Sequence, residues 1–288
     1  MAAEPMDVNP DIRYGDWTPS VETVTEAIDL SQVRKFAGVL DLDERAFEEG
    51  TALPPMWHWL FFLHRAPTAQ IGPDGHPRRG GFFPPIELQR RMFAGEQTIF
   101  HAPLRIGQSA TRTGTITRLD EKEGRSGRMV LASAHYRIEQ AGELCVEDTH
   151  DIVYIAGGGA TPAPGPDSFT PPDGAWHREV KTDPVILFRF SALSFNSHRI
   201  HYDADYAQNE EGYPGLVVHG PLTALFLSEL ARTHMDTPMT QFSFRGRAPI
   251  FEPWPFHLVG QPGDDGTVEL QAVRNDATIA MTATAQFG

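Results

Sequence analysis

The chain of 288 residues contains a single cysteine, and its apolar runs are short. One thiol, Cys145, excludes an intramolecular disulfide framework and fits the reducing environment of a cytoplasm. Cys145 lies in the strand-like run 143–146, which favours a core position over the role of a nucleophile. The longest apolar stretches, at 57–63 and 216–230, are too short or too interrupted to span a bilayer.

Basic side chains are also scarce, because 24 Lys and Arg face 38 Asp and Glu, giving a formal charge of −14. This balance argues against general affinity for nucleic acid, since neutralising phosphates needs clustered Lys and Arg. The segment from Met1 to Pro10 is acidic and has no apolar core of the kind that a signal peptide requires. We therefore expect a cytoplasmic protein without nucleic-acid or membrane partners.

Several chemical motifs are missing from the sequence. It has no G-x-S-x-G turn for a nucleophilic serine, no G-x-G-x-x-G fingerprint for a dinucleotide and no phosphate loop ending in G-K. It also lacks the paired-ligand motif H-E-x-x-H of zinc enzymes. Serine-centred hydrolysis and nucleotide-dependent chemistry are therefore unsupported, and we expect no redox cofactor and no metal.

What the sequence does have is a division into two halves. Gly and Pro dominate residues 157–176, where no hydrophobic period survives. Such a composition is typical of a linker. It separates an N-terminal half, residues 1–156, from a C-terminal half, residues 177–288.

The two halves show the same order of patterns. Apolar side chains surround most of the run 216–231, which predicts a buried helix, and the run 53–63 predicts its counterpart in the first half. Alternating or continuous apolar runs predict strands, at 97–101, 110–117, 129–138 and 145–155 in the first half and at 184–193, 240–244, 256–259, 268–273 and 278–287 in the second. This plan predicts an α+β fold in which each half wraps an antiparallel sheet around a central helix.

The segment 190–203 has an unusual density of hydrogen-bonding side chains, among them Asn196, His201 and Asp203. It ends a predicted strand and precedes the predicted buried helix, so these groups can face a cleft at which the helix N-terminus points. Each residue also has an ordinary structural explanation. Asn196 is a common turn residue, and Asp203 is placed to cap a short helix that follows it.

The spacing Asn196-x-x-x-x-His201, followed by Asp203 and the segment from Tyr213 to Gly220, resembles the R-specific enoyl-CoA hydratases, also called MaoC-like dehydratases. The sequence of residues 194–203 most resembles the subgroup with two hot-dog halves. This subgroup includes mitochondrial-type 3-hydroxyacyl-thioester dehydratases and the mesaconyl-CoA and itaconyl-CoA hydratases. The resemblance implies a double hot-dog fold. It also implies a hydro-lyase that reversibly hydrates a 2-enoyl-CoA, with coenzyme A as part of the substrate.

Hydration next to a thioester needs a base, a proton for the α carbon and a donor to the developing oxyanion. His201 is the expected acid–base residue, because its ordinary pKa lies near neutral pH. Gly220 is expected to offer its free N–H at the start of the helix as the oxyanion donor. The family has Asp where this chain has Asn196, and a carboxamide cannot act as a base. Asn196 is then expected to orient water while His201 moves the proton alone, unless Asp203 or Asp205 supplies a base.

Further substrate contacts follow from the resemblance or from residue type. We expect these at Arg199, Tyr213, Val218, His219 and Arg247. The first half is expected to supply a tunnel wall from Trp57, His58, Trp59, Phe82 and Phe83, and coenzyme A phosphates could meet Arg78, Arg79, Arg105, Arg245 or Arg247. His198, His201, Asp203 and His219 could also be arranged as metal ligands, although the motif that would support this is absent.

Three other functions remain open at this point. A dehydratase of acyl-carrier-protein thioesters is disfavoured by the acidic chain, because carrier proteins are acidic too. A non-catalytic acyl-thioester binding module would explain the missing Asp, and a hot-dog thioesterase would release a free thiol. We expect two chains to form a homodimer.

Overall fold

The computed structural model describes residue 6 and residues 8–88, 90–124, 127–157 and 160–288. Gly158 and Gly159 of the predicted linker lie outside the described residues, as do residues 1–5 and 7 of the N-terminal segment. Ten strands form one antiparallel sheet. They are β1 Glu22–Ala27, β2 Arg90–Phe100, β3 Ser109–Gly124, β4 Gly127–Gln140, β5 Glu143–Ile155, β6 Trp176–Val180, β7 Met239–Gly246, β8 Phe256–Pro262, β9 Thr267–Arg274 and β10 Ile279–Phe287.

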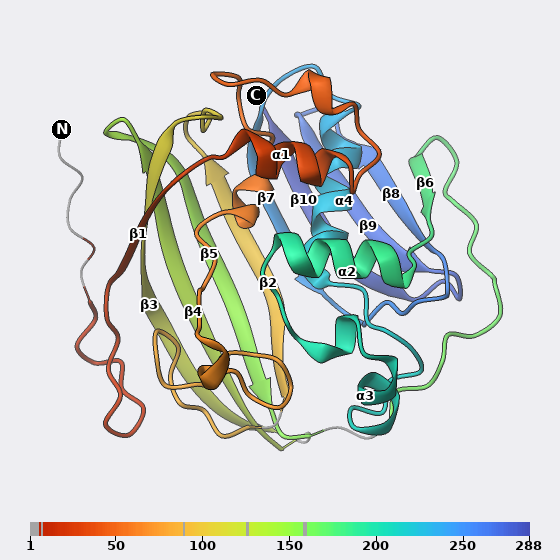
Figure 1. Cartoon of the computed structure of the whole chain (residues 1–288). Helices are drawn as coiled ribbons and strands as arrows, with labels where there is room; N and C mark the ends of the chain where they lie inside the picture. Colours follow the sequence, from red (N-terminus) through yellow and green to blue (C-terminus); the bar gives the residue numbers. More distant parts are fainter. Residues whose placement is uncertain (1–5, 7, 89, 125–126, 158–159) are drawn as a thin grey trace.

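The strand order is β1-β3-β4-β5-β2-β7-β10-β9-β8-β6, so each half contributes five neighbouring strands (Figure 1). Counted from its outer edge, each half has the order first, third, fourth, fifth, second. The two halves therefore have the same topology and meet at β2 and β7. These strands pair antiparallel over five residues, from Gly95 opposite Arg245 to Ile99 opposite Gln241.

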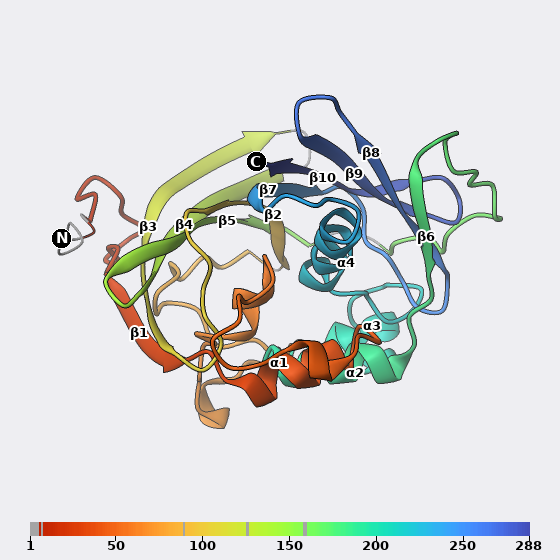
Figure 2. The ribbon, with the colours of Figure 1, turned by 90° about the horizontal axis from the view of Figure 1, so that it is seen from above.

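The central helix of the second half, α4 (Gly220–Arg232), lies in the concave side of strands β7 to β10 (Figure 2). Every residue from Leu222 to Ala231 is buried, as the apolar side chains around its circumference predict. The helix begins at Gly220, followed by Pro221, which has no N–H to leave unsatisfied in the first turn. Residues before Gly220 are extended, and Val217 forms a bridge to Phe251, so the predicted start at 216 was four residues early.

Among the residues described in the first half there is no such helix, and the prediction of one at 53–63 was wrong. Only a single 3-10 turn, Trp57–Leu60, forms there. Two prolines precede it, and Met56 and Phe62 on either side have positive φ angles of 69° and 56°, which end any helical run. Trp57 and Leu60 are nevertheless buried, so the apolar run reflects burial on several sides rather than helix. A loop covers this concave face instead (orange in Figures 1 and 2).

The strand predicted at 184–193 was also wrong, because this segment is the helix α2 (Pro184–Leu193). Asp183 caps it by accepting a hydrogen bond from the Ile186 N–H at 2.8 Å, and Pro184 occupies the first turn. Leu187 and Phe190 are buried, whereas Val185 and Phe188 are each 62 % exposed. Helix α2 packs against α1 (Leu30–Ala37), which follows β1 as α2 follows β6.

The other predicted strands are present as β2 to β5 and β7 to β10. Most are longer than predicted, whereas β10 begins one residue later than predicted. The short elements β1, β6 and α1 had not been predicted. The short helix α3 (Ala204–Asn209) begins after Asp203, whose carboxylate accepts from the Tyr206 N–H as a cap. Cys145 is buried and free, as expected. Within the described residues, no helix is both long and apolar enough to cross a membrane.

A buried carboxylate ties the two halves together away from the sheet. Glu229 of α4 is 4 % exposed and accepts hydrogen bonds from Trp57 Nε1 at 3.0 Å and from the guanidinium of Arg232 at 3.0 and 2.6 Å. Trp57 belongs to the 3-10 turn of the first half. This contact therefore holds that turn against the central helix of the second half.

We expect Glu229→Ala to lower the free energy of unfolding by about 3 kcal/mol, because it leaves a buried indole N–H and a guanidinium without their acceptor. Denaturant unfolding followed by circular dichroism measures this change. Arg45→Ala is the matched control, since the Arg45–Asp43 ion pair is exposed and its removal should leave the midpoint unchanged. Equal midpoints for Glu229→Ala and the native chain would contradict the expectation.

Candidate active site

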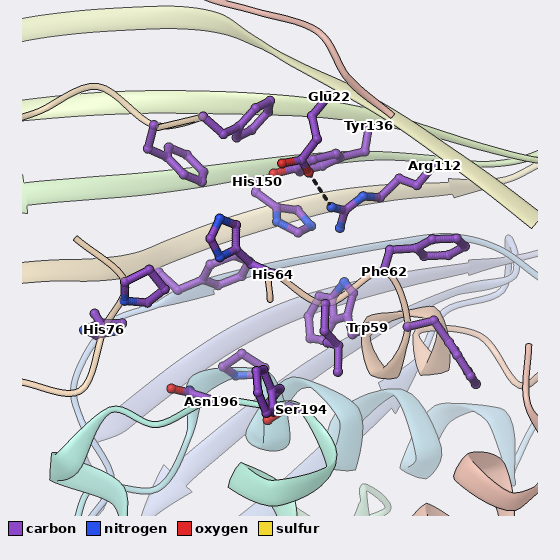
Figure 3. Close-up of a pocket in the computed structure, with 18 of the residues that line it drawn as sticks. Glu22, Trp59, Phe62, His64, His76, Arg112, Tyr136, His150, Ser194 and Asn196 are labelled. Atoms are coloured by element: carbon purple, nitrogen blue, oxygen red, sulfur yellow. Dashed lines mark hydrogen bonds and ion pairs between the residues drawn. The ribbon is translucent and has the colours of Figure 1, made fainter. Parts of the chain in front are cut away.

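A cavity of about 380 Å³ lies where the two halves meet (Figure 3). The second half contributes Asn196 and Ser197, from the loop after α2, and Pro221 at the start of α4. The opposite wall comes from the first half, with aromatic side chains such as Trp59 and Phe62. The cavity thus occupies part of the space that a central helix would fill in the first half.

His201 does not itself line this cavity. It lies in a short 3-10 turn, Arg199–His201, is 7 % exposed, and its ring is edge-on to His198, which packs on the lining residue His76. Its Nδ1 is 2.7 Å from the carbonyl oxygen of Val217, which can only accept, so Nδ1 carries the proton. Nε2 is then an unprotonated acceptor, which makes no hydrogen bond within the described residues. It keeps some access to solvent, whereas Nδ1 of His219 is fully enclosed. The backbone therefore fixes the tautomer that a general base needs.

His219 packs face to face against the His201 ring. The two rings are stacked, with centroids 3.6 Å apart and an interplanar angle of 19°. His219 is fully buried, with Nε2 2.9 Å from the hydroxyl of Ser191 and its ring edge-on to Phe190. A ring held on three sides leaves the stacked His201 little rotational freedom. His219 therefore holds the His201 ring in place and, like His201, does not line the cavity.

Burial lowers the pKa of His201 to about 4. The hydrogen bond to the Val217 carbonyl raises this pKa and nearby His76 lowers it slightly, and both effects are smaller than that of burial. Burial likewise holds the pKa of His219 well below its usual range, with smaller contributions from His201 and His198. Both imidazoles are consequently neutral at pH 7. For His201 this means that the base form is fully populated at neutral pH.

Asn196 forms a turn that aims its amide group into the cavity. Its Oδ1 accepts from the backbone N–H of His198 at 3.0 Å, and its own N–H donates to the Ser191 carbonyl at 2.9 Å. One lone pair of the oxygen is therefore engaged, and Nδ2 makes no hydrogen bond within the part of the chain that is described. Asn196 lines the cavity (Figure 3) and can offer it a hydrogen-bond donor, but no base.

Gly220 presents a free backbone N–H at the start of α4. As the first helical residue it has no acceptor inside the helix, and the helix dipole adds partial positive charge there. A Cβ built on Gly220 would meet no atom within 4 Å, so a ligand can approach this backbone closely. The neighbouring Pro221 lines the cavity. These features suit an oxyanion donor.

The structure does not bring the other predicted substrate contacts to this cavity. Arg199 is engaged with the Asp203 carboxylate at 2.8 Å and with the Pro73 carbonyl, and it lies over the Tyr206 ring. Tyr213 packs on Phe251 beneath Arg90, Val218 is buried, and Arg247 is exposed beyond β7. Since Asp203 is tied up as a helix cap and ion-pair partner, it is not placed to replace the missing Asp.

The wall predicted from the first half is largely where we expected it. His58, Trp59, Phe82 and Phe83 line the cavity, whereas Trp57 is core and bonds Glu229. Among the candidates for coenzyme A phosphates, Arg78 and Arg79 also line the cavity, and Arg78 is exposed. Arg105, Arg245 and Arg247 are exposed elsewhere on the chain.

Sequence reasoning missed a buried acid–histidine cluster in the far wall. Asp148 Oδ2 lies 3.0 Å from His58 Nε2 and 2.8 Å from His150 Nε2, and the fully buried Glu96 lies 3.2 Å from the same His150 nitrogen. Burial and the neighbouring Asp148 raise the pKa of Glu96 well above its usual range. Burial alone would raise the pKa of Asp148 too, but His150 and His58 outweigh it and lower that pKa. Of the two carboxyl groups, Asp148 is therefore the one that its neighbours favour as a carboxylate, and Glu96 the one that they favour as the neutral acid.

A second group that was missed lies beside Asn196. His76 comes from the Gly/Pro-rich loop of the first half. Its ring packs on the His198 ring with centroids 3.9 Å apart and planes tilted by 39°. The His198 ring is in turn edge-on to the His201 ring, with centroids 5.5 Å apart. Asp74, His76 and His198 have ligand atoms within 4.8 Å of one another, a grouping that can hold a metal ion. The only sequence signal was a lone histidine in an irregular loop.

With this geometry in view, comparison with known proteins identifies the family. The model of hydroxyacyl-thioester dehydratase type 2 matches residues 56–252. The chain belongs to that family. It is also 49 % identical to the mesaconyl-C(4)-CoA hydratase of Chloroflexus aurantiacus, over 94 % of this chain and 97 % of that protein.

Solved structures show the same fold. A MaoC-like dehydratase from Phytophthora capsici matches with a TM-score of 0.67 at 15 % identity, covering 94 % of this chain and 95 % of that one. A Mycobacterium tuberculosis protein described as a double hot-dog fold matches with a TM-score of 0.56 at 12 % identity, covering 92 % and 94 %. The predicted double hot-dog is confirmed. As a type 2 hydroxyacyl-thioester dehydratase, the chain is a carbon–oxygen lyase that hydrates or dehydrates acyl thioesters.

The depressed pKa of His201 predicts how activity of this dehydratase depends on pH. Protonation removes the base, so kcat/KM should fall on the acid side with an apparent pKa near 4 rather than near 6.5. Initial rates between pH 3.5 and 8 measure this limb. Because the folded pKa lies below the unfolded one, stability also falls as pH drops from 6.5 towards 4, so rates must be taken before unfolding. An acid limb centred near 6.5 would contradict the assignment.

Proposed function

We propose that the chain hydrates a 2-enoyl-CoA whose short acyl group carries a second carboxylate, of the mesaconyl-C4-CoA type. The proposal rests on three groups near one cavity. Asn196 lines it with a free Nδ2, and the free N–H of Gly220 belongs to the residue before the lining Pro221. His201, with its free Nε2, reaches the cavity wall through His198, which packs on the lining residue His76. A hydratase needs an acceptor for a water proton, a group that holds the water and a donor for the oxyanion. The 49 % identity to a mesaconyl-C(4)-CoA hydratase supports the choice of substrate.

The proposed reaction uses His201 for both proton transfers. Water, held by Asn196 Nδ2, gives a proton to His201 Nε2 as its oxygen bonds to the β carbon. The electrons of the double bond move onto the thioester oxygen, where the Gly220 N–H stabilises the enolate. His201 Nε2 then returns the proton to the α carbon on the same face, which restores the neutral imidazole. One water is consumed, and no other reactant is needed.

The charge of the cavity supports an anionic acyl group. Four arginines line it, Arg78, Arg79, Arg91 and Arg112, against two carboxylates, Glu22 and Asp148, in a chain whose formal charge is −14. A net positive cavity in an acidic protein favours an anion. Coenzyme A contributes phosphates, but these suit the exposed Arg78 better than a side chain deeper in the cavity.

Arg91 is the best candidate to meet the second carboxylate. Arg112 already pairs with Glu22 at 3.0 Å, whereas Arg91 makes no ion pair within the described residues. Burial lowers the pKa of Arg91, and its charge in turn contributes to lowering the pKa of His76 and His198. The guanidinium therefore lies close to the loop that carries Asn196. Asp74 and Tyr154 partly offset the effect of burial on Arg91, and a carboxylate on the substrate would add a direct ion-pair partner.

Activity on a panel of thioesters tests the proposed function. We expect the native chain to hydrate mesaconyl-C4-CoA faster than crotonyl-CoA, seen as loss of the conjugated-thioester absorbance, with no release of free thiol. His201→Ala should lose activity by about 10³-fold or more, because no other group accepts the water proton. Thiol release would favour a thioesterase, preference for an acyl-carrier-protein thioester would favour the other carrier, and binding without turnover would favour a non-catalytic module.

Arg91→Gln tests the carboxylate contact separately. Loss of a charge-assisted hydrogen bond should raise KM for mesaconyl-C4-CoA by about tenfold or more. Crotonyl-CoA, which lacks the second carboxylate, should keep its KM, or its inhibition constant if it is not turned over. An equal loss for both thioesters would instead assign Arg91 to the coenzyme A phosphates.

A further inference from the structure

The loop 73–76 of the first half is fastened to the loop of the second half that carries Asn196. Arg199 donates its backbone N–H to the Asp74 carbonyl at 2.9 Å and a guanidinium N–H to the Pro73 carbonyl at 3.1 Å. Ser197 donates its hydroxyl to the Gly75 carbonyl at 2.5 Å. Gly75 has a φ of +89°, and a Cβ there would lie 1.8 Å from the Ser197 carbonyl oxygen, so only glycine permits this approach.

These hydrogen bonds place the Asp74–His76 pair next to the loop that carries Asn196. Asp74 Oδ2 lies 3.2 Å from His76 Nδ1, and Asp74 Oδ1 accepts the His76 backbone N–H at 3.0 Å. Because a carboxylate accepts, Nδ1 of His76 carries the proton and Nε2 is left as an acceptor. His76 lines the same cavity as Asn196 (Figure 3) and makes no hydrogen bond through Nε2 within the described residues.

The electrostatics of the pair agree with this assignment. Burial would raise the pKa of Asp74, but the hydrogen bond and charge of His76 outweigh it and hold that pKa well below its usual range. Burial lowers the pKa of His76, against the raising effect of Asp74, and Arg91 lowers it further. The pair is therefore a carboxylate beside a neutral imidazole at pH 7, with an orientation fixed at two points.

We propose that the Asp74–His76 pair positions the attacking water in the hydration reaction, a role that rests on hydration at His201. A water molecule has two hydrogens and two lone pairs. One hydrogen goes to His201 Nε2, which removes it, and one lone pair accepts from Asn196 Nδ2. The second hydrogen goes to His76 Nε2, and the remaining lone pair attacks the β carbon. The proton transfers are unchanged, because His76 only accepts a hydrogen bond from the water and does not take up a proton.

This role answers a need created by Asn196. A carboxylate in that position could accept a hydrogen from water, whereas the free Nδ2 of Asn196 can only donate. Without His76, the second hydrogen of the water would lose the acceptor that His76 Nε2 offers, and the water would be held at fewer points. Misplacement of a reacting atom by about 1 Å can slow a reaction about 100-fold.

Three variants of the full chain test the proposal, on whichever enoyl-CoA the native protein hydrates fastest. His76→Leu removes the acceptor and should lower kcat about 100-fold, with KM changed less than twofold. His76→Gln keeps an acceptor oxygen near the position of Nε2 and should recover about tenfold of that loss. His101→Leu is the control, because His101 pairs with Glu147 outside the cavity and should keep native kcat and KM.

Asp74→Asn tests the tautomer without removing the ring. A carboxamide can still accept the His76 backbone N–H at Oδ1, but its NH₂ then faces Nδ1 and moves the ring proton to Nε2. The kcat of Asp74→Asn should fall about as far as the kcat of His76→Leu, while its thermal midpoint should equal that of the native protein. If His76→Leu fails to fold, this variant carries the test alone.

Four results would overturn the proposal. Native kcat in both His76→Leu and Asp74→Asn would remove the role. Equal losses in His76→Leu and His76→Gln, with matching falls in thermal midpoint, would make His76 structural. A matching rise in KM would make it a substrate contact, and a stoichiometric metal whose removal by EDTA abolishes turnover would make Asp74, His76 and His198 a metal site. Absence of turnover in the native protein would refute the proposed function instead.

Discussion

The backbone hydrogen bonds between β2 and β7 are the interaction on which the rest of the molecule depends. They turn two five-stranded units into one sheet and leave neither central strand with an open edge. They also fix where the concave face of one unit lies relative to the helix of the other. The cavity, the fastening of loop 73–76 and the contact between Trp57 and Glu229 all require that placement.

The two units use their concave faces differently. In the second, the buried helix α4 fills the face and starts with the free N–H of Gly220. In the first, a 3-10 turn and an irregular loop cover the face less completely. Protein interiors are close-packed, so a helix that is missing must be replaced either by other side chains or by space. Here both occur, and the space that remains is where the substrate can lie.

The sequence predicted the second unit better than the first because its signals are local. Alternation along 267–274 and the all-round apolar run before Arg232 each depend on neighbours within a few residues. The strand predicted at 184–193 was wrong because the apolar residues there suit a strand as well as a helix. The Asp183 cap and Pro184 in the first turn favour the helix that forms. His76 could not be found from spacing at all, since it reaches Asn196 only through the docking of a loop more than a hundred residues earlier in the chain. His201, Asn196 and Gly220 could be named as candidates from the sequence, because all three lie within 196–220 in the segment that resembles the family.

The repeated strand order has a consequence for how such a site can change. If the two units were separate, identical chains, every substitution would appear on both sides of the β2–β7 junction. A mutation that shortened the helix to make room for a substrate would also dismantle the histidine site at its N-terminus. Joining the units in one polypeptide removes that coupling. One unit is then free to lose its helix and leave a cavity, while the other keeps its helix and the candidate site residues around the N-terminus of that helix.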